Sequence, residues 1–384
     1  MLDKALSGGR GYWTWIFILL GIIFVGFLFW LKQYNVGLTI TGLSRDVSWG
    51  FYIAQFTFMV GVAASAVMVV LPYYLHNYKA FGKITILGEF LAIPAVIMCM
   101  AFIVVDLGQP YRLFNIFLYP SPRSLMFWDT IALGGYLLLN VLISRVTLDA
   151  EKKQIAPPKW IRFFIILSIP WAVSIHTVTA FLYAGLSARP FWMTAVLAPR
   201  FLASAFSSGP ALLILLVLLL KKVANFDAGR EPVQKLAVIA AYAMCLNVFL
   251  ILMEVFTALY SGMPEHSIHL QYLFTGIDGH TALVPWMWTS SILAVLTLIL
   301  IIPPKTRRNE TTLAIACIML FFSIWIDKGM GMIVAGYVPN PLGKVTEYFP
   351  TAPELMITLM VYAVGALLIT GLYKIALGVR ASIA

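Results

Sequence analysis

Residues 84–106 read ITILGEFLAIPAVIMCMAFIVVD, and this stretch decides the class of protein. Its charged residues are Glu89, near one end, and Asp106, at the other. A helix of about 20 mainly apolar residues crosses the ~30 Å hydrocarbon core of a bilayer. The stretch therefore predicts a transmembrane helix with one carboxylate near each end.

Nine more stretches of this kind fill most of the chain. Of its 384 residues, 61% are hydrophobic and only 11% are charged. This composition excludes a soluble domain of ordinary size and predicts an all-α integral membrane protein. The ten predicted spans cover residues 12–32, 49–75, 84–106, 126–147, 161–186, 201–220, 234–261, 281–302, 311–334 and 354–377.

The basic residues are distributed unevenly across the predicted membrane. Counted on alternate sides of the spans, 18 of the 26 Lys and Arg residues lie on the side of the two termini. Such an excess marks the cytoplasmic side. We therefore expect a multi-pass protein of the cell membrane with both termini cytoplasmic, and the net charge of +10 does not indicate nucleic-acid binding. The strongest basic segments are 152–162, 221–235 and 303–308.

The loops on the other side are longer and are rich in Pro, Gly, Tyr and Trp. Long ordered loops are where binding sites and partner contacts concentrate. We therefore expect a site near the outer face, covered by loops that dock an extracytoplasmic subunit. These outer loops are residues 33–48, 107–125, 187–200, 262–280 and 335–353.

A few ionisable residues lie at membrane depth. Asp106, Glu254 and Asp327 sit within or at the end of predicted spans, toward the outer face, and His176 lies near the middle of another span. A charged group inside a bilayer is costly, so such residues usually face a cavity or a partner and mark a functional site. The chemistry of the protein is expected at these positions.

Three cysteines, Cys99, Cys245 and Cys317, are isolated within apolar spans. They have no CxxC spacing and no histidine at ligand spacing, so they predict packing residues rather than iron–sulfur ligands or a disulfide.

The histidines do not predict a haem. Bis-histidine ligation needs two imidazoles at one depth, whereas His76 lies at the inner end of its span and His176 lies ~15 Å in from the outer end of another. A metal site among His266, His269 and His280 on one outer loop is conceivable, but solvated loop histidines are the simpler reading. We expect no haem or iron–sulfur cluster in this chain.

The strongest local pattern follows the third span. Asp106 is followed by LGQPYR at 107–112, and SPRS at 121–124 leads into Trp128 and Asp129. The Gly-x-Pro turn must bend the chain over the membrane surface. This arrangement could be a simple turn in which Asp and Arg pair, but it places two carboxylates, two arginines and several aromatic residues at one depth.

These residues carry a family resemblance. The string VDLGQPYRLFN, followed by SPRSLMFWD, resembles the signature of the NrfD/polysulfide reductase family of quinone-interacting membrane subunits. The segments at 48–69, 176–213 and 253–262 resemble further helices of the family in the expected order. The last two are similar to the ten-span, DsrP-like or HmcC-like branch found in respiratory complexes of sulfate reducers. The likeness covers roughly residues 40–340.

The resemblance implies a fold of two four-helix bundles with one flanking helix at each end. Residues 1–48 would hold the first flanking helix and its outer loop, and 49–190 the first bundle, with spans two to five. Residues 191–340 would hold the second bundle, with spans six to nine, and 341–384 the last flanking helix and the cytoplasmic tail.

The resemblance also implies a function. Family members exchange electrons between a quinone pool and an extracytoplasmic, ferredoxin-like iron–sulfur subunit, beside other membrane and cytochrome subunits of a respiratory complex. We therefore expect menaquinone or another quinone as the bound redox molecule, within a multi-subunit oxidoreductase of sulfur metabolism. The competing class is a secondary transporter or proton-conducting protein, which would instead show Gly- or Pro-interrupted helices in corresponding halves. Here Pro94, Pro170 and Pro210 are scattered.

Quinone chemistry suggests which residues act. Reduction takes two electrons and two protons, so a site needs a hydrogen-bond donor, a proton-exchanging group and an apolar slot. In the first bundle we expect Asp106 and His176 to exchange the quinone protons, so that Asp106→Asn or His176→Gln should abolish quinol-linked electron transfer. The residues expected to bind the quinone are Tyr111, Trp128, Phe181, Tyr183 and Arg200.

The second predicted bundle also contains polar and ionisable residues within its spans, but fewer that suit a quinone. Asn247 and Glu254 share a helix face, seven positions apart, and Asp327 is followed by Lys328. An ion pair between helices could be purely structural, or it could form a proton path. The predicted path comprises Glu89, Asp129, Asn247, Glu254, Asp327 and Lys328.

Overall fold

The computed structural model describes residues 2–381, which are helical except for turns and connecting loops. Over this range ten helical segments are long and apolar enough to cross a membrane, which confirms the predicted all-helical membrane fold. They are α2 (Arg10–Val36), the run α3 (Phe51–Ala63), η2 (Ala64–Ala66) and α4 (Val67–Tyr74), α5 (Gly82–Asp106), α7 (Leu125–Lys152), α8 (Ile161–Ala184), α9 (Leu197–Val223), α10 (Arg230–Tyr260), α12 (Val284–Ile301), the run α14 (Glu310–Ile324), η6 (Trp325–Gly331) and α15 (Met332–Ala335), and α16 (Ala352–Ala381).

Short helices occupy the connections between the spans. An isolated bridge joins Ile277 and His280, and the described chain forms no strand. The short helices are α1 (Leu2–Ala5), η1 (Gly37–Ile40), η3 (Lys79–Phe81), η4 (Pro110–Arg112), α6 (Asn115–Leu118), η5 (Pro190–Trp192), α11 (Pro264–Phe274) and α13 (Pro304–Arg307).

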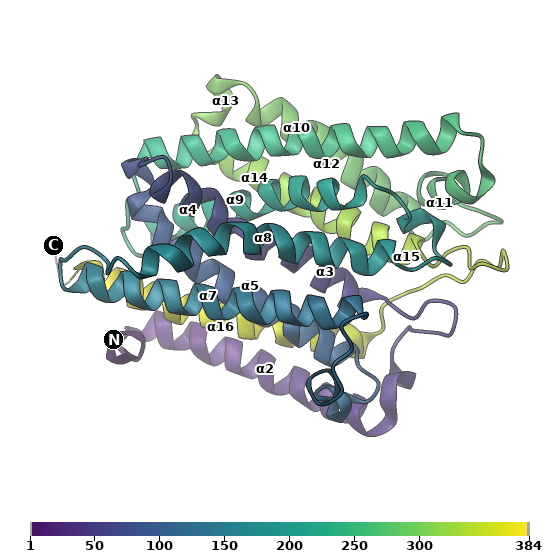
Figure 1. The fold of residues 1–384 in the computed structure, drawn as a ribbon, viewed down its shortest axis with the longest axis horizontal. Helices are drawn as coiled ribbons and strands as arrows, with labels where there is room; N and C mark the ends of the chain where they lie inside the picture. The colour runs from purple at the N-terminus through teal and green to yellow at the C-terminus, as the bar shows by residue number, and fades with distance from the viewer. Residues whose placement is uncertain (1, 382–384) are drawn as a thin grey trace.

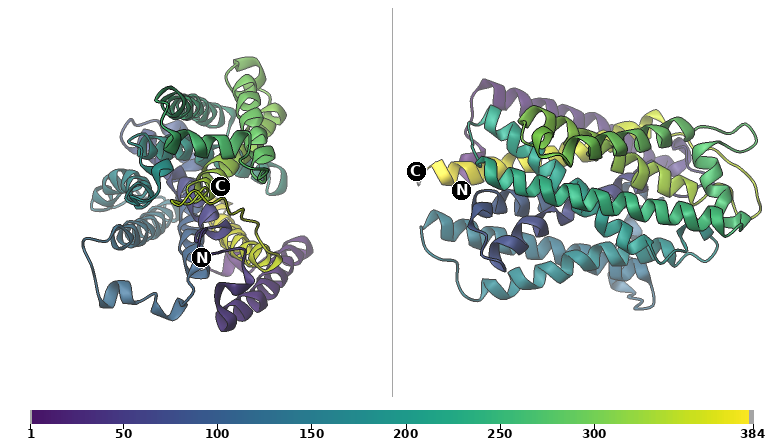
Figure 2. Two further views of the ribbon diagram at one scale, coloured as in Figure 1. Left: turned by 90° about the vertical axis from the view of Figure 1, so that its right-hand side faces the viewer. Right: turned by 90° about the horizontal axis from the view of Figure 1, so that it is seen from above.

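The long helices run side by side, and both ends of the chain lie at one end of the molecule (Figure 1). In sequence order α3 packs on α5, α5 on α7 and α7 on α8, while α9 packs on α10 and α14, and α14 on α12. Helix α3 also contacts α9 and η6, so it joins the two sets. The end-on view in Figure 2 shows α2 at the periphery, where it packs on α16. The division into two bundles with fixed boundaries stays a prediction.

Helix α3 is the buried centre of this arrangement, because every residue from Phe51 to Ala66 is shielded. Small residues let neighbouring helices approach closely, as is usual in membrane bundles. A Cβ atom on Gly209 of α9 would lie only 2.9 Å from the Cβ of Ser65. The close packing of α9 against the α3 run therefore depends on the missing side chain at Gly209.

The ninth span contains a π-helical segment, η6, between α14 and α15. Inserted π turns change the direction in which successive side chains leave a helix, and they often occur at functional sites. Asp327 and Lys328 lie within this segment. The irregularity was not predicted from the sequence, which shows only an apolar span with an Asp-Lys pair.

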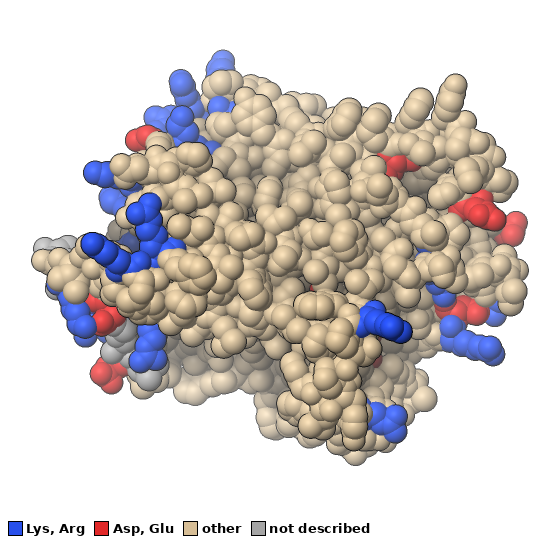
Figure 3. Space-filling model, viewed as in Figure 1, with Lys and Arg blue, Asp and Glu red and all other residues tan. Residues whose placement is uncertain are grey.

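Charged side chains gather at the two ends of the molecule in Figure 3, and basic ones concentrate at the end that holds the termini. Between these ends, the face shown is almost entirely apolar or neutral. This distribution matches the sequence asymmetry of the basic residues. It also leaves a wide uncharged zone suited to the lipid chains.

Candidate functional site

A pocket of about 330 Å³ lies among α9, α10, α11, α12 and η6. Its wall is mainly apolar and aromatic, and its charged lining residues are an arginine and two carboxylates. The apolar wall includes Phe191, Met193, Val196, Ile251, Val255, Ala258, Leu270, Leu273, Phe274, Met287 and Met332. The charged residues are Arg200, Glu254 and Asp327.

Arg200 holds the two carboxylates together. Its Nη2 donates to Oδ1 and Oδ2 of Asp327, both at 2.8 Å, and its Nη1 donates to Oε2 of Glu254. The three side chains are only 11–17% exposed. Charges held out of water need such hydrogen-bonded partners, because their desolvation is expensive. The two carboxylates and the arginine form a cluster of net charge −1 when all are ionised.

Three helices bring this cluster together. Arg200 lies in the first turns of α9, Glu254 lies about two turns before the end of α10, and Asp327 lies in η6. No two of them are near each other in the chain, so no local motif reveals their contact. The sequence predicts a quinone contact for Arg200 and a proton path through Glu254 and Asp327, but not the ion-pair cluster that joins the three residues.

Lys328 lies on the other side of the π-helical segment. Its Nζ is 4.2 Å from the centre of the Phe201 ring and donates to the Phe201 carbonyl at 3.4 Å. The side chain is buried, and a Cβ added to Gly61 of α3 would lie 3.4 Å from Nζ. Asp327 therefore faces the pocket while Lys328 faces the junction with α3.

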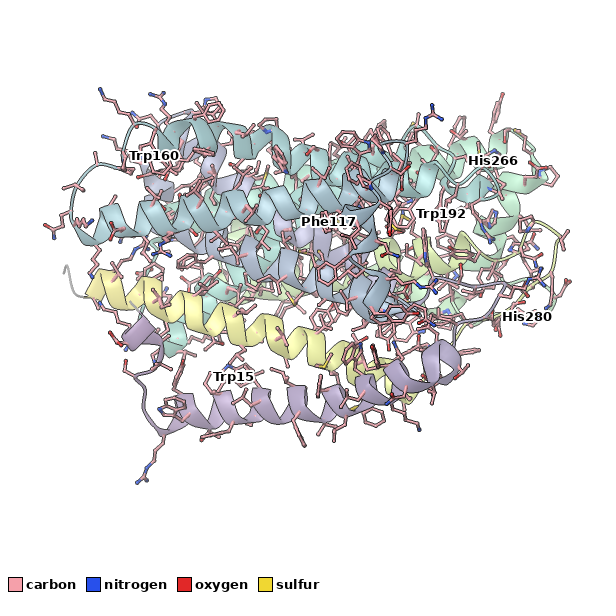
Figure 4. The ribbon with its side chains drawn as sticks, turned by 60° about the horizontal axis from the view of Figure 1, so that its bottom comes forward. Trp15, Phe117, Trp160, Trp192, His266 and His280 are labelled. Atoms are coloured by element: carbon pink, nitrogen blue, oxygen red, sulfur yellow. The ribbon has the colours of Figure 1, made fainter. Side chains whose placement is uncertain are left out.

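The pocket reaches the outer loops through α11, which carries His266 on its lining. Figure 4 shows His266 and Trp192 at the same end of the molecule, with Trp160 of a basic segment at the opposite end. Residues 262–280 were expected to be a loop, but Pro264–Phe274 is helical. The signal was available: Pro264 and Glu265 are typical of a helix start, and apolar residues follow at 270, 273 and 274.

The other two histidines of residues 262–280, His269 and His280, do not line the pocket. His269 is buried, and its Nδ1 lies 2.8 Å from the carbonyl of Ala335 and 3.0 Å from that of Val338. Burial lowers the pKa of His269 below its ordinary value, and the prediction of a solvated loop histidine is wrong for this residue. His280 is partly exposed and lies 3.5 Å from Glu347. Over the described residues no group of His, Cys, Asp and Glu is arranged to hold a metal ion.

Asp106 and His176 have different surroundings, and no hydrogen bond joins them in the described part of the chain. Asp106 ends α5, next to Val105, whose carbonyl accepts from Gln33 Nε2 at 2.6 Å. His176 is fully buried in α8, with Nδ1 2.8 Å from the Ala172 carbonyl. Asp106 Oδ1 and His176 Nε2 have no hydrogen-bond partner among residues 2–381.

Two hydrogen-bonded side-chain pairs occupy the interior near His176. The hydroxyls of Tyr183 and Thr57 are 2.5 Å apart, and Thr179 donates to Asp129 Oδ1 at 2.6 Å. All four side chains are buried. The Asp129 carboxylate thus has a hydroxyl partner and, within the described chain, no ion pair.

The aromatic residues expected around the quinone lie largely on the surface. Tyr111 is 61% exposed, Phe181 49% and Trp128 46%. Trp128 Nε1 donates to the carbonyl of Pro122 at 2.8 Å. Of the five residues expected to bind the quinone, the structure brings only Arg200 to the pocket.

Of the six predicted proton-path residues, Glu254 and Asp327 line the pocket and the other four do not, among them Glu89 and Asn247. Glu89 is buried at the inner end of α5, where Thr147 Oγ1 donates to its Oε2 at 3.4 Å. Asn247 is buried in α10, two turns before Glu254. Glu89 Oε1 and Asn247 Oδ1 have no hydrogen-bond partner in the described structure. A continuous path between these residues stays a prediction.

These features define a class: a multi-span helical membrane protein with a charged pocket near one membrane face. The chain belongs to the NrfD polysulphide reductase family, whose model matches residues 39–338. The resemblance inferred from the motifs is thereby confirmed, and its limits of roughly 40–340 agree with the match.

Named relatives align along most of the chain. A putative dimethyl sulfoxide reductase membrane subunit of Halobacterium salinarum is 26% identical, over 94% of this chain and 89% of the relative. The Hdr-like menaquinol oxidoreductase integral membrane subunit of Archaeoglobus fulgidus is 23% identical, over 85% and 80%. The menaquinone reductase integral membrane subunit of Nitratidesulfovibrio vulgaris is 22% identical, over 88% and 85%.

Proposed function

We propose that this chain is the quinone-reactive membrane subunit of a respiratory oxidoreductase and that quinone reacts in the pocket beside Arg200. The observation that carries the proposal is the Arg200–Glu254–Asp327 cluster on the wall of a mainly apolar pocket. Two relatives are named as menaquinol or menaquinone enzymes, which supports menaquinone as the substrate.

The residues present fit a quinone. A volume of about 330 Å³ is at the lower end of the ~300–1,000 Å³ typical of small-molecule pockets. Apolar and aromatic side chains line most of the wall, which suits a fused ring, and the charged groups offer directional contacts. A quinone supplies reversible transfer of two electrons and two protons.

Each charged residue has a task in this chemistry. Arg200 carries fixed N–H donors, which suit a carbonyl oxygen, and its permanent charge favours negative charge developing there. Glu254 and Asp327 are the groups able to accept or return protons. When quinol is oxidised, its two protons leave through these carboxylates and its two electrons pass to a redox centre of another subunit.

We infer that the electron partner is a ferredoxin-like iron–sulfur subunit at the outer face, beside other membrane and cytochrome subunits. The pocket lies toward this face, since α11 and His266 belong to its lining. Affinity purification of the tagged chain, followed by mass spectrometry of proteins and lipids, tests the composition. Recovery of the chain alone, without quinone or a redox subunit, contradicts the proposal.

We also propose that both termini are cytoplasmic. Most basic residues lie at the end of the molecule that holds the termini, and such an excess marks the cytoplasmic side. Reporter fusions at residue 155, in a basic segment, should report a cytoplasmic location. A periplasmic report at residue 155 would reverse the topology and move the pocket to the inner face.

A pocket-filling substitution tests the site without removing a charge. Ala258 lines the pocket on α10, so Ala258→Phe should place a ring in the pocket and raise the KM for quinol at least tenfold. Ala243→Phe is the matched control, because Ala243 is partly exposed on the same helix and does not line the pocket. Equal KM values for the two variants, both assembled in the membrane, would exclude this pocket as the quinone site.

Asp106 and His176, in helices predicted to form the first bundle, define a second candidate site. His176 Nε2 and Asp106 Oδ1 are buried without hydrogen-bond partners in the described chain, as expected for groups that meet a substrate or water. If quinone reacts there, Asp106→Asn and His176→Gln abolish quinol-linked electron transfer while the complex still assembles. Ala258→Phe would then have normal kinetics.

A further inference from the structure

The connection between α5 and α7 exposes an unusual amount of apolar surface. We call residues 107–124, which include η4 and α6, the aromatic arm. Five of its large side chains are between 58% and 77% exposed. They are Tyr111, Phe114, Phe117, Leu118 and Tyr119.

The aromatic arm stands away from the helices. In the end-on view of Figure 2 it projects sideways from the bundle, and in Figure 4 Phe117 lies on the near face. Both ends of the arm are fixed at one membrane level, because it follows the last residue of α5 and precedes the first turn of α7. It therefore runs along the outer edge of the zone that the spans cross.

The chemistry of the arm matches a lipid headgroup region better than water. Aromatic side chains with a polar edge concentrate at membrane–water interfaces. Residues 107–128 include Arg112 and Arg123 and contain no Asp or Glu, so the arm is cationic. The Arg112 guanidinium lies over the Tyr111 ring at 5.6 Å. A basic, aromatic segment of this kind is attracted to anionic phosphates.

The apolar surface also continues onto the spans. Met126 and Trp128, in the first turn of α7, are 48% and 46% exposed and follow directly on the arm. That part of α7 belongs to a membrane-crossing helix. The arm thus extends a surface that already faces lipid.

We propose that the aromatic arm lies in the headgroup layer of the outer leaflet, with its aromatic side chains among the upper acyl chains and Arg112 and Arg123 on lipid phosphates. The arm is a monotopic anchor attached to a multi-span protein. This proposal does not depend on quinone binding.

Spin labels measure the depth of the arm. The full chain, with its three cysteines replaced by alanine, receives a nitroxide at Phe117→Cys or at Leu342→Cys and is reconstituted into phosphatidylcholine vesicles with phosphatidylglycerol. Leu342 is the control, because it lies in another outer loop and is 92% exposed. The label at 117 should collide several-fold more often with oxygen than with a water-soluble nickel chelate, and the label at 342 should show the reverse.

Lipid charge gives a second readout. Replacing Arg112 and Arg123 together by Gln should lower the equilibrium constant for membrane contact of the arm by roughly an order of magnitude in vesicles with phosphatidylglycerol. The decrease should be much smaller in pure phosphatidylcholine. A label at 117 that behaves like the one at 342 overturns the proposal. So does a label that is exposed to water in the isolated chain and becomes shielded from both reagents only in the assembled complex, because a partner protein would then cover the arm.

Discussion

Two regions of this protein bury acidic side chains in opposite ways. Around the pocket, Glu254 and Asp327 are paired with one arginine and border a cavity. In the interior of α3, α7 and α8, Asp129 is satisfied by the Thr179 hydroxyl, and His176 Nε2 faces no partner in the described chain. The pocket itself lies among α9–α12 and η6, outside this interior.

The difference concerns what each region can do with a proton. A carboxylate on the wall of a cavity can contact a bound substrate and exchange a proton with it directly. A carboxyl group enclosed among packed helices, as Asp129 is, lies away from the pocket and has no such contact. The paired cluster beside a cavity is therefore the better candidate for reaction at a bound quinol, and the buried interior of α3, α7 and α8 is better suited to packing or to slow proton relay.

Loss of the shared arginine should produce the largest effect. Arg200→Met leaves two buried carboxylates without their counter-charge, which typically costs about 3–5 kcal/mol. We expect strongly reduced membrane levels and a large drop in the melting temperature in detergent. Adding Glu254→Gln and Asp327→Asn should recover most of the stability but none of the quinol activity.

Arg189→Met is the control for this series. Arg189 lies over the Tyr337 ring at 4.2 Å, and the loss of such a contact costs only about 0.5–2 kcal/mol. If Arg200→Met melts like Arg189→Met, the cluster is not important for stability, and the contrast between the two regions is lost.

Neutralising the carboxylates one at a time should separate chemistry from folding. Glu254→Gln and Asp327→Asn keep the shape of the cluster and should lower quinol oxidation by about 10²–10⁴-fold, the usual contribution of a proton-exchanging group. Glu310→Gln removes an exposed partner of Lys221 and should leave the rate unchanged.

Quinol oxidation by Asp106→Asn and His176→Gln decides whether the pocket or the interior of the other helices is the reaction site. Near-normal rates in both of these variants, with low rates in the two pocket variants, assign the reaction to the pocket. The opposite pattern assigns it to the first bundle and agrees with the expectation formed from the sequence alone.

Hydropathy and charge predicted the ten spans well, because a bilayer imposes helix length and composition directly on the sequence. The segment 84–106 became α5, which ends at Asp106 as expected. The π-helical turn at Asp327 was not predicted, because the local sequence is an apolar span with an Asp-Lys pair; in the structure this turn packs against α3 and α12. Helix α11 was missed because its short amphipathic sequence was treated as part of a loop.

The site was only partly predictable. Glu254 and Asp327 are predicted as functional because charge inside a membrane is rare, whereas Arg200 is predicted, at the end of an outer loop, among the residues that bind the quinone. Their contact depends on how three distant helices pack, and one sequence contains no direct information about that. Tyr111, Trp128 and Phe181 were selected because aromatic residues near a motif suggest a ring-binding wall, but the sequence could not tell which side of the chain faces lipid.

Interrupting the Asp129–Thr179 pair in the interior of α3, α7 and α8 should have a moderate effect on stability alone. Thr179→Val removes the hydroxyl that donates to Asp129 and leaves a buried carboxyl without that partner, which costs about 1–3 kcal/mol. We expect a lower melting temperature and an unchanged quinol rate per assembled complex. Thr177→Val, on the exposed side of α8, is the control, because its hydroxyl bonds only to its own helix. A rate that falls with Thr179→Val but not with Thr177→Val would place Asp129 in the reaction.

The smallest effect concerns the link between the two regions at the outer face. Asp46 precedes α3, and it accepts hydrogen bonds from Lys344 Nζ at 2.9 Å, Thr346 at 2.9 Å and Asn340 at 3.1 Å, in the loop that follows α15. The bond from Lys344 is the main cause that lowers the pKa of Asp46 from 3.8 to about 2. Because the folded pKa is the lower one, the stabilisation is complete above about pH 4 and is lost as the pH falls toward 2.

Hydrogen exchange of residues 340–346, corrected for the intrinsic effect of pH, measures this link. Protection in the native protein should decline between pH 4 and pH 2, since protonated Asp46 no longer holds Lys344 as an ion pair. In Asp46→Asn, protection should already be low at neutral pH and should change little with acid. Asp278→Asn, in another outer loop, should retain the native profile. If Asp46→Asn also retains it, the two loops are held together by other contacts, and the two regions are joined only through α3 and its neighbours.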